Sequence, residues 1–383
     1  MNMRHETYDA IVVGARVAGA TTAMLLAQGG ARVLLVDSAD RIGDTMSTHA
    51  LMRPAVTLLE RWGLAERLVS EGTPVVTRTS FHYGRERIVI PMKPVGALPG
   101  LISPRRWLLD PMLLEAAVAA GADLRLSTAF EGVTTGPDGT VTGAILRNRL
   151  GQSQTVRCRL LVGADGRLSR VAAAVSAAML EVTPRGAATI YGYVDGLPNE
   201  GNRWMFSPGL QAGLIPTTAG LHCAFASCPQ GDFRARFAPD ALAGLVAAIA
   251  VTDRDVAAQI ERAGPIERLT RFAGAPGHIR AAAGKGWALV GDAGYFKDPA
   301  TAHGISDALL DAHRLANAVL GSGLRAYVQS RNAHGFEFLQ LTTKIGAMDW
   351  PLGVLKSHHQ RLSAIINAEN DELAGSPELR LAA

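Results

Sequence analysis

The segment from residue 9 to residue 37 restricts the fold of this chain more than any other. Residues 9–13 (DAIVV) and 32–37 (RVLLVD) are apolar runs with the length of buried strands. Between them, residues 17–30 (VAGATTAMLLAQGG) predict a helix of small and apolar residues that ends at Gly29 and Gly30. A strand, a helix and a second strand within about thirty residues are typical of a βαβ unit. The segment therefore predicts an α/β fold with a parallel sheet.

A glycine-containing turn separates the first strand from the helix. Its sequence, 14-GARVAG-19, has glycine at the outer positions of the dinucleotide-binding pattern G-x-G-x-x-G and Arg16 at the middle one. Gly14 would make the tight turn, and Gly19 would let the helix pack close to the strand. Asp37 ends the second strand, where an acid can accept hydrogen bonds from the ribose hydroxyls of an adenosine. The alternative is an ordinary turn followed by a surface acid.

Further patterns extend this first sheet. Residues 54–70 begin with Pro54 and carry apolar residues at helical spacing, and residues 107–127 repeat the order helix, glycine, strand. Short alternating segments between Val133 and Asp165 predict a β-meander that returns to the main sheet. The chain comes back to this sheet through residues 287–292.

A second sheet is predicted from residues 75–90 and 187–227, whose strand-like segments are separated by Gly, Pro and Asn. We expect this sheet to be antiparallel. After the return to the first sheet, a helical pattern runs from Ile305 to about Leu373.

These patterns predict two domains and a helical tail, as the length of 383 residues also favours. A discontinuous Rossmann-like domain, with a parallel sheet and a β-meander, would comprise residues 1–74, 95–182 and 280–320. An antiparallel-sheet substrate domain would comprise residues 75–94 and 183–279, and a helical C-terminal region residues 321–383.

The composition argues against several classes of function. The net charge of +4 is spread along the chain without the runs of Lys and Arg that bind nucleic acid, and it is compatible with an anionic small ligand. The cysteines, Cys158, Cys223 and Cys228, have neither the number nor the spacing of a disulfide framework or zinc site. We expect packing cysteines, no metal and a cytoplasmic protein. No apolar run has the length of a membrane span.

Two further motifs follow the first in a fixed order. They are 163-GADGRLSRV-171 and 291-GDAGYFKDPATAHG-304. In order and separation the three motifs resemble those of the single-component FAD-dependent monooxygenases, the para-hydroxybenzoate hydroxylase-like family. The resemblance covers roughly residues 8–320. It implies that the Rossmann-like domain binds FAD.

The resemblance assigns roles in the late motif. It implies that Asp292 accepts hydrogen bonds from the ribityl hydroxyls, that Pro299 shapes the loop beside the isoalloxazine, and that the backbone of Gly304 and Ile305 reaches its pyrimidine end. Reduced flavin is anionic there, and the amides of a helix N-terminus stabilise negative charge. Gly291 belongs to the same motif.

Other segments are assigned in the same way. Asp165 and Gly166 resemble the family's second fingerprint near the pyrophosphate, although a simple turn is the alternative. Arg106, followed by Leu109, fits an R-x-x-L helix start whose arginine reaches the ribityl or phosphate region, and a solvated arginine is the alternative. The full set of expected cofactor contacts is Gly14, Arg16, Ala18, Gly19, Asp37, Ser47, Thr48, Arg106, Ala129, Asp165, Gly166, Gly291, Asp292, Pro299, Gly304 and Ile305.

Residues 44–51 (DTMSTHAL) resemble a segment that follows the face of the flavin in one branch of the family. Ser47, Thr48 and His49 would then contact the flavin, and His49 is the candidate catalytic side chain. A capping loop before the next helix is the alternative.

The chain also departs from the family pattern. Arg16 replaces the middle glycine, and Ser38 stands where many relatives have arginine, which Arg41 could replace. Tyr295 and Ser306 occupy positions that are commonly histidine and asparagine. These departures concern the placement of the flavin.

The expected reaction is an NADH- or NADPH-dependent hydroxylation or epoxidation by O2, through a flavin C4a-hydroperoxide, of an aromatic or polycyclic small molecule. Such chemistry needs a pocket that excludes water. Aromatic residues of the second sheet are candidates for its wall, namely Phe81, Tyr83, Tyr191, Tyr193, Trp204, Phe206 and Phe225. Alternating spacing puts some of them on one strand face, which ordinary core residues also show.

Other activities stay open. The halogenase signature W-x-W-x-I-P lacks its tryptophan pair before Ile215 and Pro216, which argues against halogenation. Alternatives are an FAD-dependent reductase or dehydrogenase of an apolar alkene, resembling geranylgeranyl reductases, and a non-catalytic nucleotide-binding module. The sequence identifies neither the substrate nor the oligomeric state.

Overall fold

The largest sheet forms the base of the cofactor domain in the computed structural model, which describes residues 6–45 and 47–375. Within these residues it has eight strands, in the order β18-β19-β10-β1-β2-β7, with β9 paired to β10 and β8 paired to β9. The strands β1 (Thr7–Val13), β2 (Val33–Val36), β7 (Asp123–Arg125), β10 (Ser153–Gly163) and β19 (Trp287–Leu289) run parallel. The strands β8 (Ala129–Thr135), β9 (Val141–Arg147) and β18 (Ala283–Gly284) pair antiparallel. The predicted α/β class, parallel sheet and β-meander are confirmed.

Helices cover one face of this sheet. They are α1 (Val17–Gln28), α2 (Arg53–Arg61), α3 (Ala65–Ser70), α4 (Arg106–Ala119) and α9 (Gly304–Asn317), and their apolar residues share one core with β1 and β2. The helix predicted over residues 54–70 is in fact two, α2 and α3. Gly63, at the break, has φ +70°, a conformation that a continuous helix does not contain. The short helix α5 (Arg170–Ala174) packs with the β-meander on the other face.

The second sheet has seven strands in the described part of the chain, in the order β16-β12-β15-β14-β13-β4-β5. Their bounds are β4 (Arg78–Tyr83), β5 (Glu86–Pro91), β12 (Ala188–Val194), β13 (Asn202–Ser207), β14 (Leu210–Pro216), β15 (His222–Cys228) and β16 (Thr270–Phe272). The sheet is antiparallel as predicted, except that β13 and β4 pair in parallel. These two strands lie far apart in the sequence, so no hairpin turn fixes their direction.

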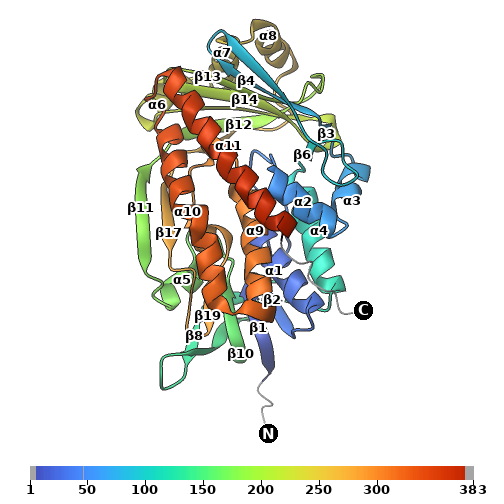
Figure 1. The fold of residues 1–383 in the computed structure, drawn as a ribbon, viewed down its shortest axis with the longest axis vertical. Helices are drawn as coiled ribbons and strands as arrows, with labels where there is room; N and C mark the ends of the chain where they lie inside the picture. Colours follow the sequence, from blue (N-terminus) through green and yellow to red (C-terminus); the bar gives the residue numbers. More distant parts are fainter. Residues whose placement is uncertain (1–5, 46, 376–383) are drawn as a thin grey trace.

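Both faces of the second sheet are covered. Apolar residues of α6 (Gln230–Phe237), α7 (Ala241–Ala250) and α8 (Arg254–Ala263), which the sequence patterns did not predict, pack on its outer face. Those of α10 (Leu324–Ala347) and α11 (Leu352–Gly375) pack on its inner face. Figure 1 shows this sheet at the top of the molecule, with α7 and α8 beyond it and α10 and α11 running down the body. Every residue of β12, β14 and β15 is consequently buried.

A small sheet connects the two larger ones. It consists of β11 (Met179–Arg185), β17 (Pro276–Arg280) and β20 (Tyr295–Phe296), and the predicted domain boundary between residues 182 and 183 falls inside β11. A separate two-stranded sheet pairs β3 (Val75–Val76) with β6 (Leu101–Ile102). The helical C-terminal region is confirmed through α11, and residues 376–383 of that prediction lie outside the described residues.

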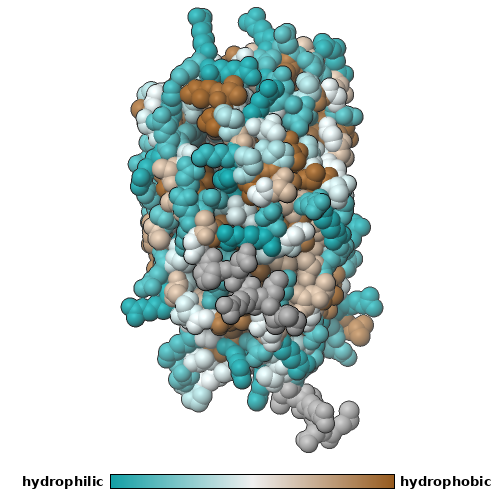
Figure 2. All heavy atoms as spheres, turned by 45° about the vertical axis from the view of Figure 1, so that its right-hand side comes forward, coloured by the Kyte–Doolittle hydropathy of each residue, from teal (hydrophilic) through white to brown (hydrophobic). Residues whose placement is uncertain are grey.

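The surface mixes hydrophilic and apolar side chains on the face that Figure 2 shows. None of the helices described is both long enough and apolar enough to cross a membrane. Within residues 6–45 and 47–375, no group of His, Cys, Asp and Glu side chains is arranged to hold a metal ion. Cys158, Cys223 and Cys228 are buried free thiols, as expected, and burial raises the pKa of each, in the case of Cys223 to about 12.

Candidate functional site

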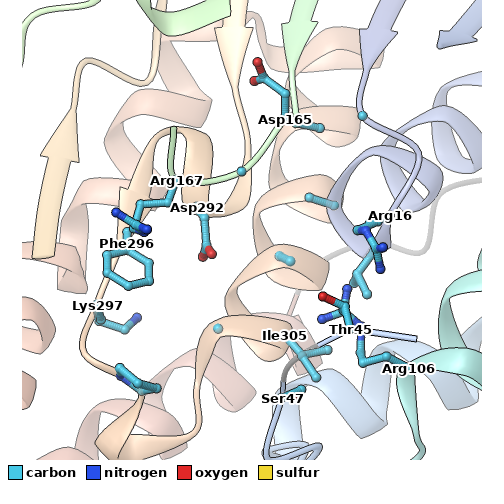
Figure 3. A pocket seen from close by; sticks show the side chains of 18 of the residues that line it. Arg16, Thr45, Ser47, Arg106, Asp165, Arg167, Asp292, Phe296, Lys297 and Ile305 are labelled. Carbon is cyan, nitrogen blue, oxygen red and sulfur yellow. The ribbon is translucent and has the colours of Figure 1, made fainter. Parts of the chain in front are cut away.

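A cavity of about 570 Å³ lies where α1 and α9 begin, between the first and second sheets. Figure 3 shows Arg16, Arg106 and Ser47 on one side of it, and Asp292, Phe296 and Lys297 on the other. Most of the expected cofactor contacts line this cavity, namely Gly14, Arg16, Ala18, Asp37, Ser47, Thr48, Arg106, Ala129, Asp165, Gly166, Asp292, Pro299, Gly304 and Ile305. Residues from three distant parts of the sequence therefore surround one space.

The two other expected contacts, Gly19 and Gly291, do not line the cavity. Each has a role in the backbone conformation next to it. A Cβ atom on Gly19 would lie 1.7 Å from the carbonyl oxygen of Gly14, so only glycine allows this approach of helix and turn. Gly14 itself has φ +104°, and its N–H donates to the carbonyl of Val36 over 2.8 Å. Gly291 has φ +58°, and its N–H donates to the carboxylate of Asp311 over 3.0 Å.

Asp37, expected to bind the ribose hydroxyls, also holds the glycine turn. Its Oδ2 accepts the N–H of Ala15 over 2.8 Å, and its Oδ1 accepts the N–H of Ala39 over 2.9 Å. A carboxylate has further lone pairs, so these two bonds leave room for a ribose hydroxyl.

One side of the cavity carries a pair of arginines. The carboxylate of Asp110 is fully buried, and Arg106 binds both its oxygens over 2.5 and 2.8 Å. Arg16 reaches the same carboxylate over 3.1 Å. Two guanidinium groups thus share one carboxylate, which leaves a net positive charge that suits a diphosphate. Arg16 has ordinary extended backbone, φ −88°, so the position does not need glycine. Sequence reasoning missed Asp110.

Asp165 lines the cavity and also stabilises the turn that follows it. Its carboxylate accepts hydrogen bonds from the Ser169 hydroxyl over 2.5 Å and from the N–H groups of Arg170 and Val171 over 2.6 and 3.1 Å. These bonds hold the start of α5. Gly166, with φ +76°, then carries the chain along the cavity to Arg167.

The carboxylate of Asp292 lines the cavity and is free to bind a ligand. It lies in the 3-10 helix η2 (Gly291–Ala293), and none of the described residues donates a hydrogen bond to its carboxylate. Burial, followed by the charge of Asp307, raises the pKa of Asp292 to about 6, against the opposing effect of Arg106 and other cations. The side chain is only partly buried and lines the cavity, so its carboxylate can accept hydrogen bonds from a flavin's ribityl hydroxyls.

The loop between Asp292 and α9 is held by internal contacts. The carboxylate of Asp298 accepts the N–H groups of Ala187 and Ala300, both over 2.8 Å, at the start of the 3-10 helix η3 (Pro299–Thr301). Lys297 lies on the cavity wall, with its Nζ 2.5 Å from Asp307. His303, the residue before α9, lines the cavity as well, and its ring packs against Phe338 of α10.

The departures from the family pattern have structural partners. The hydroxyl of Tyr295 donates to the carbonyl of Gly335 over 2.9 Å, so this side chain is directed to α10. The Ser306 hydroxyl accepts the N–H of Met52 over 3.0 Å and ties α9 to the start of α2. Ser38 lines the cavity, whereas Arg41 is exposed and outside its wall.

His49, the candidate catalytic residue, lies behind the cavity wall. Thr48 and Ala50 line the cavity, but His49 does not, and it is completely buried. Its Nε2 lies 2.5 Å from the hydroxyl of Tyr193, and its Nδ1 has no hydrogen-bond partner. Burial lowers the pKa of His49 to about 3. The imidazole is therefore neutral near pH 7. Met46, in the same predicted segment, lies outside the described residues.

Only part of the expected substrate wall faces the cavity. Tyr191 lines it, whereas Phe81, Tyr83, Tyr193, Trp204, Phe206 and Phe225 do not. The side chains of α10, α11 and Trp350 cover that face of the sheet and make these rings part of a core. Phe206, for example, packs edge-on against Trp350 with ring centroids 6.3 Å apart. The sequence patterns missed the residues that line the cavity instead, among them Thr189, Phe272, Phe296, Lys297 and His303.

The cavity fits FAD in its donors and acceptors. Gly14 and Gly19 form a close backbone turn, Arg16 and Arg106 supply positive charge, and Asp292 supplies an unpaired acceptor.

Comparison with known sequences supports this assignment. The sequence model described as "FAD binding domain" matches residues 7–335. Digeranylgeranylglycerophospholipid reductase of Methanosarcina acetivorans is 30% identical over 176 residues, 43% of this chain and 39% of the relative. Phenol 2-monooxygenase of Pseudomonas sp. is 26% identical over 186 residues, 45% and 30% of the two chains. The chain thus matches well under half the length of these relatives. Digeranylgeranylglycerophospholipid reductase 1 of Methanococcoides burtonii is 26% identical over 333 residues, 83% and 76% of the two chains.

Solved structures share the fold. The flavin-dependent brominase Bmp2 has a TM-score of 0.78 at 17% identity, covering 95% of this chain and 93% of its own. PqsL of Pseudomonas aeruginosa, described as a probable FAD-dependent monooxygenase, has a TM-score of 0.76 at 22% identity, with 94% and 100% covered. Aklavinone-11 hydroxylase, solved with FAD and aklavinone, has a TM-score of 0.71 at 21% identity, with 91% and 70% covered. At these identities the likeness establishes the fold alone.

Proposed function

The chain belongs to the FAD-binding domain family of para-hydroxybenzoate hydroxylase-like flavoproteins, with FAD as its cofactor, and from this premise we propose that it is a monooxygenase. It would use NADH or NADPH as reductant and insert one oxygen atom of O2, by hydroxylation or epoxidation, into an aromatic or polycyclic small molecule. One observation carries the proposal: aromatic side chains of the second sheet line the same cavity as the start of α9.

These aromatic side chains come from the edge of the second sheet. Tyr191 of β12 and Phe272 of β16 line the cavity together with Gly304 and Ile305 at the start of α9. Aromatic side chains offer flat apolar surfaces on which an aromatic substrate can stack. They also exclude water from the space next to the cofactor, which oxygen transfer requires.

The remaining chemistry would be shared between the cofactor and the charged loop. When bound, FAD supplies electron transfer from the nicotinamide to O2. The N-terminal amides of α9 would stabilise negative charge at the pyrimidine end of the ring. Lys297 adds a positive charge on the same wall, and its ion pair with Asp307 fixes the position of its ammonium group.

Reduction of an apolar alkene is the second candidate function. It is supported by the Methanococcoides burtonii relative, a reductase by name that aligns with most of this chain. The two candidates use the same cofactor site and differ in the need for O2.

Labelled oxygen distinguishes the candidates. The FAD-loaded protein, NADPH or NADH and a panel of phenolic, polycyclic and isoprenoid compounds are incubated under 18O2, and products are identified by mass spectrometry. We expect one atom of 18O in a product from an aromatic member of the panel. Conversion of an isoprenoid without O2, by saturation of a double bond, would instead establish the reductase. Protein that contains no flavin after expression and cannot be loaded with FAD would contradict the premise itself.

A further inference from the structure

Arg170, the first residue of α5, lines the cavity and is exposed. Its backbone N–H donates to the carboxylate of Asp165 over 2.6 Å. In the described part of the chain its guanidinium makes one hydrogen bond, from Nη1 to the carbonyl oxygen of Phe130, and at 3.5 Å this bond is weak. A guanidinium has five N–H donors, so most of those of Arg170 stay available to a ligand in the cavity.

The contact with Phe130 places this guanidinium near the end of β2. Thr128, two residues before Phe130, donates its N–H to the carbonyl oxygen of Asp37 over 2.8 Å. In a Rossmann-like domain the acid that ends the second strand binds the ribose of the adenosine, so the adenine base attached to that ribose lies close to this segment. The residues of this region that line the cavity are Asp37, Ser38, Thr128, Ala129 and Arg170.

Position 38 lacks the cation that many members of the family have directly after the acid. Ser38 lines the cavity in its place. Arg41 is exposed and outside the wall, and the guanidinium of Arg125 pairs with Glu6 over 2.5 Å. Arg170 therefore brings to this part of the wall, from a different element, the positive charge that position 38 does not supply.

We propose that Arg170 binds the adenine base of FAD. A guanidinium is planar and stacks on the faces of aromatic rings, and its N–H groups can donate to the ring nitrogens of a purine. Both interactions need the adenine and neither involves the flavin ring. Arg170 then contributes to the selection of FAD over FMN, which has no adenosine.

The variant Arg170→Met tests the proposal, because methionine keeps an apolar side chain and removes the charge. Dissociation constants of FAD and FMN from the flavin-free protein are measured by flavin fluorescence. We expect FAD to bind about fivefold more weakly, as for the loss of an exposed cation–π contact, and FMN to bind as before. AMP, a probe of the adenosine end alone, should compete with FAD less well in the variant than in the unmodified protein.

A compensating variant tests whether the position of the charge matters. In the double variant Ser38→Arg with Arg170→Met, an arginine stands directly after Asp37, and most of the FAD affinity should return. The matched control is Arg41→Met, which removes an exposed arginine outside the cavity wall and should leave both dissociation constants unchanged.

Two results would overturn the proposal. One is an FAD affinity of Arg170→Met equal to that of the unmodified protein. The other is an equal loss of affinity for FAD and FMN, because the contact would then not be with adenine. A lower melting temperature of the flavin-free variant, alongside that equal loss, would assign Arg170 to the fold through its bond to Phe130.

These measurements are independent of the reaction. A protein that binds FAD but oxygenates no compound would contradict the proposed monooxygenase and leave the measurements on Arg170 valid.

Discussion

The Nε2 atom of His49 lies 2.5 Å from the hydroxyl oxygen of Tyr193, and the two side chains join the loop before α2 to strand β12. The backbone of His49 has φ +65°, a conformation that costs energy in a residue other than glycine. On its other face, Tyr193 carries the guanidinium of Arg105, 3.6 Å from the ring centroid. Thr48 and Ala50, on either side of His49, line the cavity. The buried hydrogen bond to Tyr193 therefore holds this part of the cavity wall in place despite the unfavourable backbone conformation of His49.

Removing the hydroxyl of Tyr193 should destabilise the protein, because the hydrogen bond to His49 is lost. In Tyr193→Phe the Nε2 of His49 loses its partner, and we expect the free energy of unfolding to fall by about 1–3 kcal/mol. In the double variant Tyr193→Phe with His49→Leu the polar group itself is gone, so much of this loss should be recovered. Urea denaturation of the single and double variants measures both effects. Equal stability of Tyr193→Phe and the unmodified protein would show that this hydrogen bond contributes nothing.

Gly19→Ala tests whether FAD binding depends on the close approach of α1 to the glycine turn. In Gly19→Ala the new Cβ would overlap the carbonyl oxygen of Gly14 at 1.7 Å, so the helix must move away from the turn. We expect FAD retention to fall at least tenfold, together with a lower melting temperature. The control is Gly353→Ala in α11, where a Cβ atom meets nothing within 4 Å. It should leave FAD binding unchanged, and comparable losses in both variants would remove Gly19 from the cofactor site.

The sequence predicted those parts of the site whose contacting residues lie close together in the chain, within one motif. Gly14, Gly19 and Asp37 hold one another within a single βαβ unit, and Asp292 and Gly304 lie in one short segment. The spacing of these residues in the sequence therefore determines their relative positions in the structure. His303 and Lys297 stand in the same segment and were overlooked, because the direction of their side chains depends on the backbone around Ala302, which has φ +55°, and on Phe338 of α10.

The substrate wall could not be predicted in the same way. Alternation along β12 and β13 shows which residues share a strand face, but not what covers that face. The cover is formed by α10 and α11, which follow more than a hundred residues later and take Trp204 and Phe206 into the core. The parallel pairing of β4 with β13 is likewise a contact between distant segments, for which short-range patterns contain no signal.

Two aromatic substitutions should therefore have opposite consequences. Phe272 is only partly buried and lines the cavity, so Phe272→Ala should raise the KM for an accepted substrate severalfold with a small change in stability. Phe225 is 2% exposed and packs against Trp204, with ring centroids 5.4 Å apart, so Phe225→Ala should cost about 3–5 kcal/mol of folding free energy. Steady-state kinetics on the first substrate from the labelled-oxygen panel, with thermal denaturation, compares the two. A larger KM effect from a stably folded Phe225→Ala would place the substrate on the other part of the sheet.

The affinity for FAD should depend on pH through Asp292. Burial raises the pKa of this carboxyl to about 6 in the flavin-free protein. Ribityl hydroxyls that donate to the carboxylate favour its ionised form and lower its pKa in the complex, so FAD binding releases a proton in the interval between the two values. Affinity should accordingly be greatest above about pH 6 and fall as the pH decreases through that value. Fluorescence titration of the apoprotein with FAD between pH 5 and 8 measures this dependence.

The variant Asp292→Asn tests whether this carboxyl is the source of the dependence. An amide of the same size has no titrating group, so the FAD affinity of the variant should lose most of the change between pH 5 and 8. Above pH 6 it should also be about ten- to a hundredfold weaker, since a hydrogen bond to a charged acceptor is worth about 1.5–3 kcal/mol. The matched control is Asp298→Asn, which alters an acid of the same loop whose carboxylate is already occupied by the N–H groups of Ala187 and Ala300. A pH dependence that persists in Asp292→Asn and disappears in Asp298→Asn would transfer the role to Asp298 and require a different path for the ribityl chain.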